Sequence, residues 1–129
     1  MNPKHCVSLE IAKQLKEAGY NQRGECWWFI SPMSDPIIVS ANPLLGHSEE
    51  AYVAPLATEI LEELPFGLEG ENGNDILKIE RYKNGYSVCY FDDGQDKYTG
   101  KTHLLKMSDT LPNALAKLWL YLKKGGIER

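Results

Sequence analysis

The strongest helical pattern in the chain runs from Leu111 to Lys124. At about 100° per residue, its apolar positions form one stripe along a helix. The residues of this stripe are Leu111, Ala114, Leu115, Leu118 and Leu122. Ser108 and Asp109 precede the stripe and offer N-cap oxygens, and two glycines follow it as a stop. The pattern predicts a helix that covers the core and leaves Leu120, nearly opposite the stripe, exposed to solvent.

Two further segments repeat apolar residues at helical spacing. The first begins at Ser8, a good N-cap residue, and ends before Gly19, which can take a left-handed conformation. The second lies between Pro55 and Pro65, and proline is favoured at the first turn of a helix and disfavoured inside one. Both segments therefore predict amphipathic helices.

The clearest β pattern consists of two alternating runs separated by Asn84-Gly85, a pair typical of tight hairpin turns. With Lys83 opposite Tyr86, the alternation defines a core face and a weaker face. The core face carries Leu77, Ile79, Arg81, Tyr86, Val88 and Tyr90. The weaker face carries Ile76, Lys78, Glu80, Tyr82, Ser87, Cys89 and Phe91. Residues 97–104 are expected to return as a third strand.

Aromatic and β-branched residues also predict a strand over Cys26 to Ile30, paired with a short strand over Ile37 to Ser40. Residues 41–50 and 66–75 are rich in turn-forming residues and are predicted to be loops. Together the elements predict an α+β fold: an antiparallel sheet of three to five strands, built as a meander, with three α-helices mainly on one face. We expect residues 1–129 to form a single domain.

Composition narrows the possible functions. The chain has 129 residues and a formal net charge of -4, which argues against nonspecific binding to nucleic acid. Its apolar runs are far shorter than the roughly 20 residues of a membrane span, and its first residues lack a signal-type apolar region. Three widely spaced cysteines are typical of a reducing compartment. We therefore expect a cytoplasmic protein that binds neither membrane nor nucleic acid.

Candidate catalytic and metal-binding groups are sparse. Gly100-Lys101-Thr102 imitates the end of a phosphate-binding loop, but the upstream glycine is misplaced and no helix follows directly. Cys89 or Cys26, with His103 or His47 as base, would give a cryptic thiol enzyme. His5, Cys6, Cys26 and His47 contain zinc-binding groups without a paired half-site. We therefore expect no cofactor, no metal and no enzymatic activity.

Aromatic residues outnumber catalytic groups, which favours a protein that acts by binding another protein. The predicted surface consists of Trp28, Phe91 and the exposed Leu120, and it could also join copies of the chain in a homo-oligomer. An alternative is a small-molecule or nucleotide binder with a pocket between sheet and loops, in which Arg81, Tyr98 and Lys101 supply polar contacts.

Three segments carry a resemblance to a known group of proteins. They are residues 7–20 (VSLEIAKQLKEAGY), 54–65 (APLATEILEELP) and 114–124 (ALAKLWLYLKK). The pattern resembles that of small uncharacterised proteins carried by bacteriophages and prophages. The resemblance implies a phage or prophage context, in which such a protein could inhibit host defence, and it implies no catalytic residues.

Overall fold

The fold contains helices and antiparallel strands, as the sequence predicts. A computed structural model describes residues 5–40, 45–46, 48–65, 67–70, 73–92 and 101–124. Within these ranges the helices are α1 (Leu9–Glu17), α2 (Ala57–Glu63) and α3 (Leu111–Lys123). The strands are β1 (Trp27–Ile30), β2 (Ile37–Val39), β3 (Glu50–Val53), β4 (Gly67–Gly70), β5 (Gly73–Tyr82), β6 (Gly85–Asp92) and β7 (Lys101–Ser108). The fold is therefore α+β.

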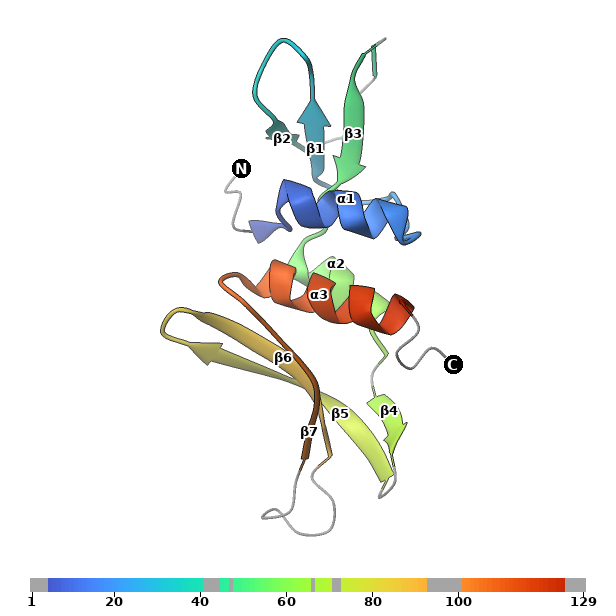
Figure 1. The fold of residues 1–129 in the computed structure, drawn as a ribbon, viewed down its shortest axis with the longest axis vertical. Helices are drawn as coiled ribbons and strands as arrows, with labels where there is room; N and C mark the ends of the chain where they lie inside the picture. Colours follow the sequence, from blue (N-terminus) through green and yellow to red (C-terminus); the bar gives the residue numbers. More distant parts are fainter. Residues whose placement is uncertain are drawn as a thin grey trace.

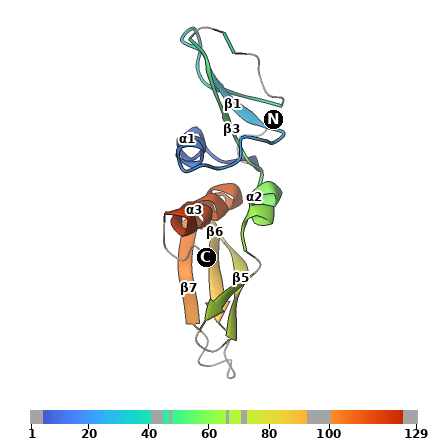
Figure 2. The same cartoon turned by 90° about the vertical axis from the view of Figure 1, so that its right-hand side faces the viewer.

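The strands divide between two sheets, where the sequence predicted one. The first sheet has the order β2-β1-β3 and the second the order β4-β5-β6-β7, and all neighbours are antiparallel. Helix α1 contacts β3 and α3, and α3 in turn contacts β6 and β7. The helices thus lie between the two sheets (Figures 1 and 2). The buried residues of both sheets and all three helices form one cluster.

Helix α1 begins and ends where its sequence predicts. The Ser8 hydroxyl accepts a hydrogen bond from the Ile11 N–H at 3.4 Å, and Gly19 adopts a φ of +93° just beyond the last turn. The buried residues of the helix are Ile11, Ala12 and Leu15. The Ser8 N–H also donates to the Asn113 side-chain oxygen at 2.9 Å. This bond joins the start of α1 to the first turn of α3.

Helix α3 has a different N-cap from the predicted one. Thr110 caps it, accepting a hydrogen bond from the Asn113 N–H at 3.4 Å, whereas Ser108 is the last residue of β7. The prediction that Leu120 faces solvent is wrong, because only 5% of its surface is exposed. Leu120 lies beside a shallow groove lined by Gln14 of α1 and Lys106 of β7. Since α3 has a layer on each side, it buries a wider arc than a helix packed on one face.

The hairpin of β5 and β6 forms, but with a different register. Tyr82 pairs with Gly85, so Lys83 and Asn84 occupy the turn, and Arg81 rather than Lys83 is opposite Tyr86. The pairing moves by two residues, which keeps every side chain on its predicted face. Val88 and Tyr90 of the predicted core face are fully buried, whereas Ile79 and Arg81 of the same face, near the hairpin end, are exposed.

Tyr90 fixes the hairpin to the end of α2. Its hydroxyl donates a hydrogen bond to the Pro65 carbonyl oxygen at 2.7 Å. Burial of the ring raises the pKa of Tyr90 to about 12, because the phenolate would lose its hydration. The hydroxyl therefore stays protonated near neutral pH and remains a donor.

Other boundaries differ modestly from the predictions. Helix α2 begins at Ala57, and the Glu59 carboxylate accepts a hydrogen bond from the Leu56 N–H at 2.9 Å. Residues 50–53 form β3, which was not predicted, and residues 67–70 and 73–75 are strands within the predicted loop. The third strand of the hairpin sheet was predicted over residues 97–104 and occupies 101–108, while residues 97–100 lie outside the described ranges.

Candidate protein-interaction surface

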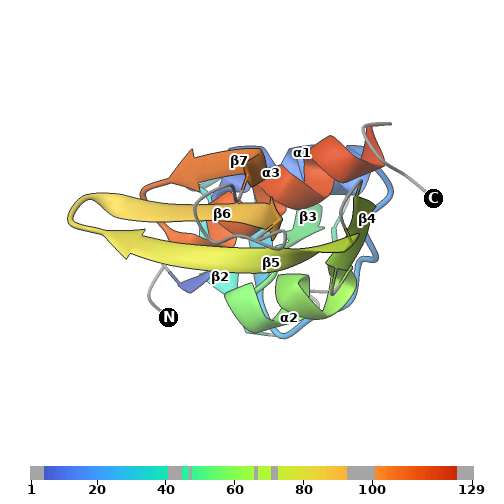
Figure 3. The same cartoon turned by 90° about the horizontal axis from the view of Figure 1, so that it is seen from below.

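The second sheet has one face against α3 and an opposite face that carries exposed apolar side chains. We call the opposite side the open face. It consists of the even-numbered positions of β5 from Ile76 to Tyr82, the odd-numbered positions of β6 from Ser87 to Phe91, and Leu105 and Met107 of β7. Figure 3 shows this sheet from below, with α3 behind it.

Exposure differs sharply between the two faces of the sheet. On the α3 side, Val88 and Tyr90 are 0% exposed, whereas Ile79, nearer the hairpin end, is 39% exposed. On the open face, Ile76 is 48% exposed, Leu105 50% and Met107 56%. Large apolar side chains at these exposures, on one face of the two strands that flank β6, are typical of a contact surface rather than of isolated surface residues.

A small polar centre lies between the apolar residues of the open face. Ser87 and Cys89 of the middle strand are 2% exposed each. The Ser87 hydroxyl has no hydrogen-bond partner among the residues that the structure describes. Such a buried hydroxyl is costly in a finished core.

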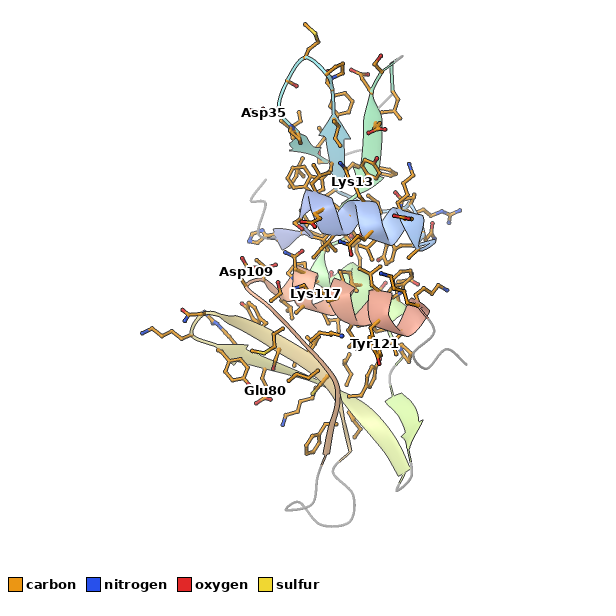
Figure 4. All side chains as sticks on the ribbon, viewed as in Figure 1. Lys13, Asp35, Glu80, Asp109, Lys117 and Tyr121 are labelled. Atoms are coloured by element: carbon orange, nitrogen blue, oxygen red, sulfur yellow. The ribbon has the colours of Figure 1, made fainter. Side chains whose placement is uncertain are left out.

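The described charges of the open face balance. The Lys78 ammonium lies 3.8 Å from the Glu80 carboxylate and 4.5 Å from the centre of the Phe91 ring. In Figure 4, Glu80 lies on the side of the sheet opposite Tyr121 and Lys117 of α3. A balanced pair on an apolar surface gives no strong net repulsion toward another protein, even though the chain as a whole carries -4.

The structure separates the three residues that the sequence grouped as an interaction surface. Phe91 lies on the open face and is partly buried. Trp28 belongs to the other sheet, where its indole N–H donates to the Val7 carbonyl oxygen at 2.9 Å and ties down the segment before α1. Leu120 is in the core. Of the three, only Phe91 is part of the open face.

The residues proposed for a small-ligand pocket do not form one in the described part of the chain. Arg81 is exposed near the hairpin end, Tyr98 lies outside the described residues, and of Lys101 only the backbone, at the start of β7, is described. A shallow groove of about 470 Å³ occurs elsewhere, between the start of α3 and the start of α2. Arg81 is not among the described residues that line it.

The cysteines lie in the interior of the protein. Cys6, Cys26 and Cys89 are all less than 3% exposed, and burial raises the pKa of each thiol. For Cys6, burial and the neighbouring Cys26 raise the pKa to about 11. Thiols with raised pKa values are poor nucleophiles near neutral pH. The side chains of His103 and His47, the predicted bases, lie outside the described part.

Comparisons with known proteins give no indication of what this surface binds. No protein-family model, curated protein or solved structure matches this chain.

None of the described helices is long and apolar enough to cross a membrane. Among the residues that the structure describes, no three His, Cys, Asp or Glu side chains gather to hold a metal ion. His47, named with the possible zinc ligands, lies outside those residues.

Sequence reasoning found the position of Phe91 but missed Leu105 and Met107. The two missed residues lie beyond the end of the predicted third strand, which stopped at residue 104. The signal was present in the sequence, since residues 105 to 108 alternate between apolar and polar side chains. Continuing the strand to Ser108 would have placed both on one face.

Proposed function

We propose that this chain is a non-enzymatic protein-binding protein, and that its binding surface is the open face. The observation that carries the proposal is the contrast along the middle of one sheet: Val88 and Tyr90 are fully buried toward α3, and Met107 is 56% exposed on the other side. Exposed apolar patches of this kind are usually functional in monomeric proteins.

The chemistry of the open face indicates the kind of partner. Its apolar residues favour a partner with a flat apolar surface, since a sheet face lacks the depth of a ligand pocket. Lys78 and Glu80 favour a partner that offers one acidic and one basic group at matching positions. Buried thiols with raised pKa values argue against a thiol enzyme.

The biological setting is a second part of the proposal. The resemblance of three segments to bacteriophage and prophage proteins supports an accessory role in which a host or phage protein is bound. An inhibitor of host defence is one such role. Binding through an apolar sheet face needs no cofactor, which is consistent with this role.

A matched pair of methionine variants tests the proposed function. Met107→Glu places a charge on the open face, and Met33→Glu places the same charge on the β1–β2 loop of the other sheet, where Met33 is 89% exposed. Tagged wild type, Met107→Glu and Met33→Glu chains are incubated with bacterial lysate and with an untagged copy of the chain. We expect Met107→Glu to lose a protein that wild type and Met33→Glu both retain. Equal retention by all three chains would contradict the proposed function.

A further inference from the structure

We propose that the partner on the open face is a second copy of this chain, so that two sheets stack face to face about a two-fold axis. This inference rests on the proposed function of the open face and names its occupant. It is argued from the strand register, from the charges and from the area of the face.

The register defines a line across the sheet about which the open face is self-complementary. Ile79 pairs with Val88, and Val88 pairs with Lys106, so these three residues lie in one row across β5, β6 and β7. Stacked sheets lie about 10 Å apart with nearly aligned strands. Consider a two-fold axis that lies midway between the two sheets and runs parallel to this row. It places each residue of one copy over the same strand of the second copy, at the position equally far from the row in the opposite direction.

This symmetry brings unlike charges together. Lys78 and Glu80 flank Ile79 on the same strand, so Lys78 of one copy lies over Glu80 of the other, and the reverse pair follows from the symmetry. The existing contact within each copy, at 3.8 Å, becomes a four-charge arrangement of alternating sign. Opposite charges at matched positions set both register and partner choice.

The same symmetry brings apolar residues together. Leu105 and Met107 flank Lys106, so Met107 of one copy lies over the strand segment of the other copy that carries Leu105, where the pairing of β6 with β7 has a bulge. Ile76 lies over Tyr82 in the same way, at the two ends of the β5 face. Every exposed apolar residue in these pairs therefore meets an apolar residue rather than a charge.

The area of the face predicts a weak dimer. Three strands spaced by about 4.8 Å, over seven residues rising about 3.3 Å each, span roughly 14 Å by 23 Å. Two such faces bury roughly 650 Å² as flat areas, below the roughly 1,200 Å² at which stable specific interfaces begin and in the range of weak, transient contacts. We therefore expect monomers in dilute solution and dimers at high micromolar concentration.

Charge reversal tests this inference and separates a second copy from any other partner. The chain is 14.6 kDa, so light scattering over a concentration series is expected to show a mass rising toward twice that value. Lys78→Glu or Glu80→Lys alone places like charges opposite each other at two symmetric positions and is expected to weaken the dimer about tenfold. The double variant restores opposite charges in both pairs and is expected to return within about threefold of wild type.

The control variant is Lys13→Glu, which makes the same charge change on α1, with α3 between it and the second sheet (Figure 4). It is expected to dimerise like wild type, and melting curves check that every variant is folded. A wild-type mass that stays at 14.6 kDa throughout would overturn the inference, as would a double variant that fails to recover. If the wild type stays monomeric but Met107→Glu alone loses a lysate protein, this inference fails and the proposed function stands. If Met107→Glu changes neither mass nor capture, both fail.

Discussion

Replacing Gly85 with alanine is expected to destabilise the protein by about 3 kcal/mol, because the added methyl group has no room. A Cβ at this position would overlap the Ser108 carbonyl oxygen and lie 3.2 Å from Asp109 Cα. Both neighbours are backbone atoms at the junction of β7 and α3, so relief requires the strands to separate. The measurement is the midpoint of urea unfolding, converted to free energy with the slope of the transition.

Gly19→Ala is the matched control for Gly85→Ala. A Cβ at Gly19 meets no atom within 4 Å, although the φ of +93° is unfavourable for alanine. The expected cost is therefore only about 1 kcal/mol, from backbone conformation alone. If both variants unfolded at the same urea concentration, the close approach of β7 to Gly85 would be disproved.

Replacing Leu118 with alanine is expected to cost about 3 kcal/mol, in the range for large-to-small changes in a packed core. Leu118 is 0% exposed and belongs to the helix that lies between α1 and the second sheet. A cavity there loosens contacts with two layers at once. Thermal and urea unfolding, analysed together, would measure the loss.

Leu105→Ala makes the same chemical change on the open face. Leu105 is 50% exposed, so truncation is expected to cost less than about 1 kcal/mol. It is also expected to weaken association, which Leu118→Ala should affect only through unfolding. Similar stability losses for the two variants would mean that the open face is covered within a single chain.

Local patterns were enough to predict the helices and the hairpin. Ser8 and Gly19 fix the ends of α1 by short-range hydrogen bonds and backbone conformation, which depend on neighbouring residues alone. The alternation of β5 and β6 predicted the faces correctly even though the turn moved to Lys83 and Asn84. A shift of two residues preserves side-chain direction, so the faces were insensitive to that error.

Features that depend on distant contacts were not predictable. The four residues of β3 are too few for a periodic signal, and they form a strand because they pair with β1. The exposure of Leu120 depends on whether one or two layers pack on α3, which the sequence of the helix does not encode. For the same reason the sequence grouped Trp28 with Phe91, although the helical layers separate their sheets.

Methionine oxidation tests most directly whether the open face is a protein-binding surface. Met33 and Met107 are both exposed in a single chain, at 89% and 56%, and each reacts with peroxide when accessible. Mass spectrometry of peptides gives the ratio of their oxidation rates in dilute protein, in concentrated protein and in lysate. We expect the oxidation of Met107 to become at least about threefold slower relative to that of Met33 as association proceeds, because contact excludes the oxidant. A ratio that stays constant under all three conditions would contradict it.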